Sequence, residues 1–301
     1  MVKSHPVSSA LLSLLLLGGL LAGSAAWAAG SEALRVGVTL HPYYSWTRNV
    51  VEGTNVVVIP VLPGDIDAGN YQPRPEDIKK LMSLDAIVIN GIGHDDFIFP
   101  MIKASGNSEI QIIRPNANVP LLNSTHGDKV NSHTFISFSN AIQGSYAIAT
   151  ALGSLQPNRA GSFREHAAAY ARRLRKIKNR AAAQLANRHI DRVVTVHDGY
   201  GYLMQELGIE IAGVVEPAHG LLPSVEELAQ MIDLIRREKI RVVFSEVSFP
   251  APLVDAVRAE SDVHVYVISH IASGEFTPEK FENEMQGNVD TIVEALVTDG
   301  R

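Results

Sequence analysis

The stretch PNRAGSFREHAAAYARRLRKIKNRAAAQLANRHI, residues 157–190, decides how the rest of the chain is organised. Apolar side chains recur along it at spacings of four, three, four and four, the pattern of one buried stripe on a helix: Tyr170, Leu174, Ile177, Ala181 and Leu185. After Gly161, no glycine or proline interrupts the stretch. A helix of this length predicts a rigid connection between two halves of the protein, whereas a Gly/Ser-rich linker would be flexible.

On both sides of this helix, short β-branched runs alternate with helical runs, which predicts parallel sheets built from βαβ units. We expect strands at 34–40, 54–62, 84–91, 109–115, 192–197, 210–215, 241–246 and 263–269. We expect helices at 45–51, 76–83, 139–155, 201–207, 224–238, 250–260 and 277–296. Pro60 favours an edge position for the second strand. The predicted class is α/β, with two lobes, each a mostly parallel sheet flanked by helices, joined by one long rigid helix. The predicted boundaries are 34–156 for the first lobe, 157–189 for the linking helix and 190–301 for the second lobe.

Residues 1–28 have the pattern of an export signal. Lys3 precedes an apolar run at 10–23, and Ala26 and Ala28 provide the small residues that a signal peptidase accepts. A retained N-terminal anchor is the alternative. The chain has no cysteine, so we expect neither a disulfide scaffold nor a lipid anchor on an N-terminal cysteine. We therefore predict a periplasmic protein that is released by cleavage and is not a lipoprotein.

Composition and motifs exclude several classes of function. The formal net charge is −6, which argues against a nucleic-acid partner. The sequence has no Gly-x-Gly-x-x-Gly after a predicted strand, no P-loop, no Gly-x-Ser-x-Gly and no His-Glu-x-x-His. Nucleotide binding and the common hydrolase motifs therefore have no support.

Histidines gather at the predicted carboxyl ends of strands, where open α/β sheets bind their ligands. The candidates at strand ends or at the approach to a helix are His41, His94, His133, His197 and His270, and Glu246 also ends a strand. Any one of these histidines could be an ordinary surface or hydrogen-bonded residue. Their shared position favours a transition-metal site, because several imidazoles in one cleft are typical of such sites. Three histidines plus a water would also be a catalytic layout.

Four segments together resemble one known family along essentially the whole chain after the leader. VIPVLPGDIDAGNYQPRPEDIKKLMSLDAIVINGIG (58–93) is similar to a stretch with Pro-Gly, Asp-Pro-His and x-Tyr-Glu-Pro-x-Pro. NSHTFISF (131–138) is similar to Asp-Pro-His-x-Trp-Leu-Asp-Pro. VHDGYGYLMQELGI (196–209) and FSEVSF (244–249) are similar to His-Asp-Ala-Phe-x-Tyr-Phe and Phe-x-Glu-Pro-Gln. The chain thus resembles the metal-binding solute receptors of bacterial ABC importers for zinc, manganese and iron, the solute-binding protein 9 type, which includes adhesins.

The resemblance implies two lobes with a metal ion between them, and it carries His133 and His197 over as ligands. Two other family ligands are missing, because Gly69 stands in place of the first histidine and Ser269 in place of the last aspartate. The residues suggest replacements. His270 and His94 are the first choices, and Asn70 and His41 are the weaker ones. Glu246 is an expected acceptor for an imidazole N–H.

The expected function is capture of a divalent transition metal, zinc above all, and its delivery by a monomeric protein to the membrane permease of an ABC importer. Imidazole ligands favour zinc, copper or nickel over manganese, which prefers carboxylates, although manganese and iron stay possible. Affinity should fall as the pH drops through about 6.5. One alternative is a receptor for a metal chelate or other small ligand, with a wide cleft lined by Tyr43, Tyr44, Tyr71 and Arg74. A metal-dependent hydrolase is the other.

Overall fold

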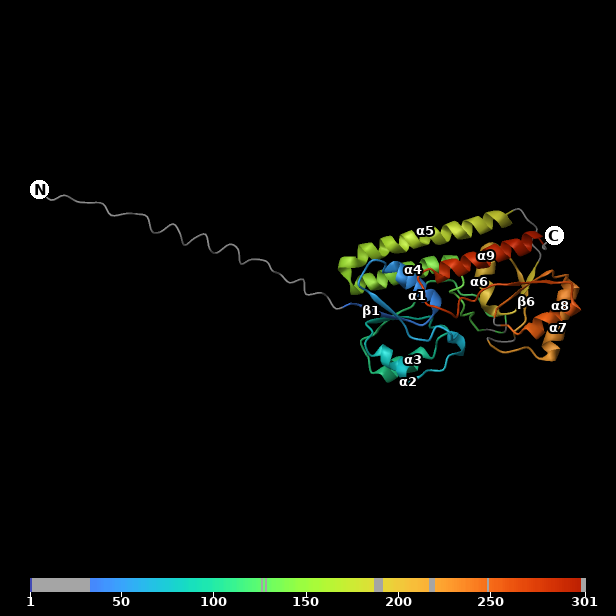
Figure 1. Cartoon of the computed structure of the whole chain (residues 1–301), viewed down its shortest axis with the longest axis horizontal. Coiled ribbons are helices and arrows are strands. Elements are labelled where there is room, and N and C mark those ends of the chain that lie inside the picture. Colours follow the sequence, from blue (N-terminus) through green and yellow to red (C-terminus); the bar gives the residue numbers. More distant parts are fainter. Residues whose placement is uncertain are drawn as a thin grey trace. The chain divides into compact units, whose positions relative to one another are not determined.

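The computed structural model describes residues 1, 33–125, 127, 129–186, 192–216, 220–247 and 249–298 (Figure 1). The chain divides into Met1–Ala33 and Leu34–Arg301, and the second unit contains all the helices and strands described below. The predicted export signal, apart from Met1, lies outside the described residues. Among the described helices, none combines the length and apolar character needed to cross a membrane.

Two four-stranded parallel sheets with the same strand order form the framework, which confirms the predicted fold class. The first sheet has the order β2-β1-β3-β4, with β1 Arg35–Val38, β2 Val57–Pro60, β3 Ala86–Val88 and β4 Gln111–Ile113. The second has the order β6-β5-β7-β8, with β5 Val193–Thr195, β6 Ile211–Val214, β7 Val242–Ser245 and β8 His264–Val267. The strand that carries Pro60 lies at an edge, as predicted, where a missing backbone donor is tolerated. The carboxyl ends of the strands carry most of the candidate residues.

Helices flank both sheets. They are α1 His41–Val50, α2 Pro75–Leu81, α3 Ile98–Ser105, α4 Phe138–Leu155, α5 Ala160–Leu185, α6 Gly201–Leu207, α7 Val225–Glu238, α8 Ala251–Glu260 and α9 Lys280–Thr298. Short 3-10 turns occur at η1 Ala68–Asn70, η2 Pro157–Arg159 and η3 Asp198–Tyr200. Helix α1 begins four residues before the predicted start, because Pro42 fits its first turn. Helix α3 was not predicted, because its short apolar sequence contains a proline and shows no helical period.

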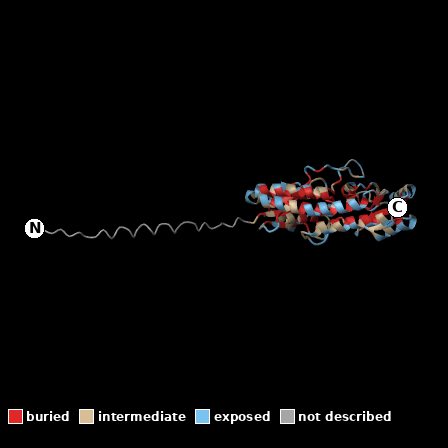
Figure 2. Ribbon diagram, turned by 90° about the horizontal axis from the view of Figure 1, so that it is seen from above, coloured by how far each residue is buried: buried red, intermediate tan, exposed pale blue. Residues whose placement is uncertain are grey.

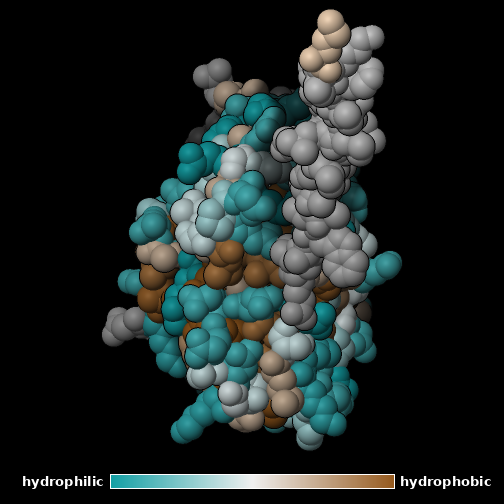
Figure 3. All heavy atoms as spheres, turned by 90° about the vertical axis from the view of Figure 1, so that its left-hand side faces the viewer, coloured by the Kyte–Doolittle hydropathy of each residue, from teal (hydrophilic) through white to brown (hydrophobic). Residues whose placement is uncertain are grey.

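The long helix α5 confirms the pattern on which the fold prediction depends. All five residues of the predicted stripe are buried, and Phe163 and Ala167 extend it toward the first turn. Figure 2 shows the same division along the helices, with buried segments facing inward and exposed segments outward. Hydrophilic side chains cover most of the described surface in the view of Figure 3, with hydrophobic atoms visible between them. A capping box begins α7, because the side chains of Ser224 and Glu227 each accept from the other's backbone N–H.

The C-terminal helix α9 runs beside α5 and starts against α1 (Figure 1). Phe281 packs edge-on against Trp46 of α1, with ring centres 5.4 Å apart, and Ser45 Oγ donates to the carbonyl of Thr277 at 2.8 Å. Farther along, Arg180 of α5 pairs with Asp290 at 3.2 Å. Helix α9, which the predicted boundaries place in the second lobe, therefore packs against α1 of the first lobe. The predicted lobe boundaries remain a prediction.

Candidate metal centre

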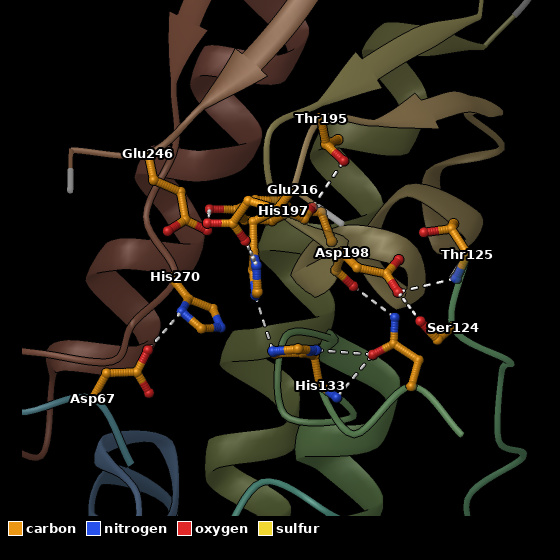
Figure 4. Close-up of polar contacts among 12 residues, drawn as sticks. Asp67, Ser124, Thr125, His133, Thr195, His197, Asp198, Glu216, Glu246 and His270 are labelled. Carbon is orange, nitrogen blue, oxygen red and sulfur yellow. Dashed lines mark hydrogen bonds and ion pairs between the residues drawn. The ribbon is translucent and has the colours of Figure 1, made fainter. Parts of the chain in front are cut away.

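Three buried imidazoles form one group between the two sheets (Figure 4). Their candidate ligand atoms all lie within 4.8 Å of one another. The side chains are those of His133, before α4, His197, after β5, and His270, after β8. They are 5%, 2% and 8% exposed. Two of the three follow strands at the carboxyl end of the second sheet, as the sequence predicted.

His133 is oriented by its own loop. Asn131 Oδ1 accepts from the backbone N–H of His133 at 2.9 Å and lies 3.0 Å from its Nδ1. Because an amide oxygen only accepts, Nδ1 carries the proton and Nε2 keeps its lone pair. Asn90 Nδ2 donates to the carbonyl of Ser132 at 2.9 Å and ties this loop to the end of β3. The ring therefore offers Nε2 to the centre of the group.

His197 is oriented by a carboxylate. Its Nδ1 lies 2.6 Å from Glu216 Oε2, so Nδ1–H donates to Glu216, and its Nε2 lies 3.0 Å from His133 Nε2. Two zinc–nitrogen bonds of about 2.0–2.1 Å at a tetrahedral angle hold their nitrogens about 3.3 Å apart. The observed separation is close to that value. Such a carboxylate–imidazole pair fixes the ring and makes it a stronger ligand.

Two carboxylates of the centre were missed by the sequence analysis. Glu216 comes two residues after the end of β6, so the rule that selected the histidines would have found it too. Asp67 precedes η1 and lies between two rings, with Oδ2 3.6 Å from His270 Nδ1 and Oδ1 3.5 Å from His94 Nε2. It lies two residues before Gly69, where the family has its histidine. This loop therefore places a carboxylate beside the imidazoles.

His94 lies beside the three-imidazole group. It is 5% exposed, and its ring centre is 5.0 Å from that of His133 and 6.0 Å from that of His270. Asp95 holds its loop by accepting from the N–H groups of Asn90 at 2.7 Å and Gly91 at 2.8 Å. This position makes His94 and Asp67 the two candidates for a fourth ligand.

The structure bears on three weaker predictions and corrects two of them, those for Asn70 and His41. Asn70 is exposed at the end of η1, beside Gly220 of the second lobe, and not in the group. His41 Nε2 lies 3.0 Å from the carbonyl of Gly274, and the ring stacks on Phe276. The side chain therefore points toward Gly274 and not toward the three imidazoles, the direction predicted for a ligand. Burial lowers the pKa of His41, although the bond to Gly274 opposes this. Glu246 accepts from Tyr200 Oη at 2.9 Å, and Glu216 lies on His197 Nδ1, so the role of Glu246 as an acceptor for an imidazole N–H stays a prediction.

The wide aromatic cleft of the chelate alternative is not formed by the residues predicted for it. Tyr43 is fully buried and bonds Asn90, Tyr44 packs on Phe276, and Tyr71 and Arg74 both bond Asp77. A cavity of about 740 Å³ instead opens beside the imidazoles, lined by residues that include Gly91, Gly93, Lys129, Ser132, His133, His197, Asp198 and Glu216. This cavity reaches two of the three imidazoles.

Carboxylates dominate the electrostatics of the centre. Burial alone would lower the pKa of His197, but the bond to Glu216 and the charges of Glu246, Glu216 and Asp67 raise it above the usual 6.5. Burial raises the pKa of the Glu246 carboxyl, although His197 and the bond from Tyr200 oppose this. The centre therefore attracts positive charge, either a proton on His197 or a cation.

The raised pKa of His197 predicts a specific dependence on pH. A ligand nitrogen must be neutral, so protons compete with metal as the pH falls through this raised pKa, above 6.5 rather than at it. The folding stability of the metal-free protein changes with pH in the opposite direction to the metal affinity. The protonated ring adds stability that is complete below about 6.5 and is lost as the pH rises through the raised pKa.

Substituting Glu216 tests this account. Glu216→Gln keeps a side chain of the same shape but removes the charge that raises the pKa of His197. We expect zinc affinity at pH 8 to fall about 10–100-fold, as for other partners that orient a metal ligand. We also expect the decline in affinity to begin at a lower pH than in the wild type. Calorimetric titrations between pH 5.5 and 8 measure both effects, and an unchanged pH profile would contradict the assigned role of Glu216.

Known proteins that this chain resembles in sequence and structure are metal-binding and metal-transport proteins. The SBP FpvC of Pseudomonas aeruginosa, solved in complex with Mn²⁺, is 43% identical, with a TM-score of 0.83 over 88% of this chain and 99% of that one. The metal ABC transporter substrate-binding lipoprotein FimA of Streptococcus parasanguinis is 25% identical over 295 residues, covering 93% of this chain and 95% of that protein. The zinc-binding protein AdcA of Streptococcus pyogenes is 22% identical over 261 residues, which cover 78% of this chain and about half of AdcA.

A model of the family ZnuA, described as zinc-uptake complex component A, periplasmic, matches residues 36–295. This range includes all three histidines of the group and, apart from Arg35, both sheets. The chain therefore belongs to the ZnuA family of metal-transport substrate-binding proteins.

Proposed function

We propose that this protein captures a divalent transition metal ion, with zinc favoured, and delivers it to the permease of an ABC importer. The observation that carries the proposal is the buried group of His133, His197 and His270, whose ligand atoms lie within 4.8 Å of one another. The three rings come from segments far apart in the sequence, which is expected for a site formed by the approach of two lobes. The ion is cargo, so the protein binds and releases it without turnover.

The donor set explains the preference for zinc. Three imidazole nitrogens suit zinc, copper and nickel better than manganese. His94 or Asp67 completes a four-coordinate site, in which a closed shell of protein ligands suits storage of the ion better than catalysis. Glu216 and Asp67 also supply negative charge to balance the cation. FpvC is in complex with Mn²⁺ in one structure and Ni²⁺ in another, so both ions belong in any titration.

The place of action follows from the same proposal. The leader pattern and the description of the ZnuA family both favour the periplasm, whereas FimA is named a lipoprotein. We propose that the protein works there as a monomer, with a membrane permease as its partner and with no nucleic-acid partner.

Calorimetry with stripped protein tests the proposal. We expect zinc to bind tighter than about 1 µM, with copper and nickel comparable and manganese weaker. The affinity of the His133→Ala variant should fall sharply, whereas Asn70→Ala should match the wild type. If no free divalent metal binds tighter than micromolar, the proposal is wrong.

A metal chelate is the second candidate cargo, because the 740 Å³ cavity beside His133 and His197 exceeds the space that a bare ion needs. A chelate receptor would bind little free metal and would tolerate His133→Ala. The same titrations therefore separate the two candidates.

A further inference from the structure

Gly199 lies against two of the three imidazoles. It is the middle residue of η3, two positions after His197. A Cβ atom placed on Gly199 would lie 2.7 Å from Cδ2 and 3.1 Å from Nε2 of His197, and 3.3 Å from Cδ2 of His270. Carbon atoms pack at about 3.5–4.0 Å, so any side chain at this position must displace a ring.

The backbone does not require glycine at this position. Residues 198–200 form a right-handed turn, and Gly199 is not among the glycines with positive φ. Alanine suits such a turn better than glycine, which loses more conformational freedom on folding. The reason for glycine is therefore the space that it leaves for the two rings.

The contacts described for the two rings differ in length. His197 is fixed by Glu216 at 2.6 Å and contacts His133 at 3.0 Å. His270 has a longer contact, with its Nδ1 3.6 Å from Asp67 Oδ2, and Ile271, the next residue, has a φ of +59°, a costly conformation for a β-branched residue. An added Cβ at 199 would meet His197 first, at 2.7 Å from Cδ2, so the ring of His197 must shift. His270, whose ring centre lies 4.6 Å from that of His197, is the neighbour that must then make room.

We propose that Gly199 is a specificity-determining position, because the absence of a side chain admits His270 as the third imidazole. This inference rests on the proposed function and deepens it. With a methyl group at 199, His133 and His197 remain, and Asp67 is the nearest oxygen donor. Such a site resembles an oxygen-rich manganese site more than a nitrogen-rich zinc site.

The test compares Gly199→Ala with the matched control Gly201→Ala, whose added Cβ would lie no closer than 3.7 Å to its nearest neighbours. Zinc and manganese affinities are measured for each purified, stripped protein. We expect Gly199→Ala to weaken zinc by about 100-fold or more, the upper end of the loss seen for partners outside the coordination shell, with manganese changed far less. Gly201→Ala should leave both affinities within about threefold of the wild type, since a contact at 3.7 Å causes no strain.

Three further measurements separate the loss of His270 as a ligand from general destabilisation of the protein. His270→Ala should weaken zinc strongly in the wild type and add little in the Gly199→Ala background, because both changes remove the same ligand. The absorption of bound Co²⁺ should shift alike in Gly199→Ala and His270→Ala. If Gly199→Ala lowers the stability of the metal-free protein, adding His270→Ala should restore it by giving the His197 ring room to move.

The outcomes also distinguish this inference from the proposed function. If the wild type binds no zinc, the proposed function fails. The proposal for Gly199 alone is overturned in three cases: equal zinc binding by wild type and Gly199→Ala, additive losses in the double variant, or a stability loss that His270→Ala does not restore.

Discussion

Replacing His197 with alanine is expected to weaken zinc binding by at least about 100-fold. A protein zinc site is worth on the order of 12 kcal/mol, so each of four ligands contributes about 3 kcal/mol, which corresponds to about 150-fold in affinity. The loss at this position should be at the high end, because the substitution also leaves the partly buried Glu216 carboxylate without its imidazole partner. Competition with a chromophoric chelator at pH 8 measures the change.

Two controls make the result specific. Asn70→Ala removes an exposed side chain at the end of η1. His41→Ala removes a buried imidazole that bonds the carbonyl of Gly274 and lies outside the three-imidazole group. Both should bind zinc within about threefold of the wild type, because neither side chain belongs to the three-imidazole group. A comparable loss in His41→Ala, or full retention in His197→Ala, would show that the ligands are misassigned.

Zinc is expected to raise the unfolding temperature of the stripped protein by about 8–16 °C. A ligand at 1,000 times its Kd stabilises the folded state by about 4 kcal/mol when the unfolded chain does not bind it. In a domain of this size, each kcal/mol raises the Tm by about 2–4 °C. The three histidines lie 64 and 73 positions apart in the sequence, so the unfolded chain does not present them together. Differential scanning calorimetry with and without excess zinc measures the shift.

The stabilisation must depend on the assembled site. A strong chelator should reverse it, and the His133→Ala variant should show a shift of only a few degrees at the same zinc concentration. If zinc stabilises His133→Ala as much as the wild type, the ion binds elsewhere on the protein.

Local patterns were sufficient to predict the framework. The stripe on α5 and the β-branched runs led to two parallel sheets and a connecting helix, because burial of one face imposes these periods on the sequence. Helix α3 lacked such a period. The docking of α9 on α1 could not be read locally, since Phe281 meets Trp46 across 235 positions of chain.

The site was predicted only in part, and the errors have one physical cause. The strand-end rule selects the correct edge of a sheet but does not say which way a side chain points. His197 turns into the centre, whereas His41 turns toward Gly274, 233 positions away. Asp67 was missed because its partners, His94 and His270, lie on other segments that only the fold brings to it.

X-ray diffraction from crystals of the zinc-loaded protein, recorded on both sides of the zinc absorption edge, tests the central claim most directly. The account predicts one strong anomalous peak about 2.0–2.1 Å from His133 Nε2, His197 Nε2 and a ring nitrogen of His270. A fourth bond to Asp67 or His94 would complete the shell. A peak bound to two or fewer of these three imidazoles, or a peak elsewhere on the protein, would contradict the account.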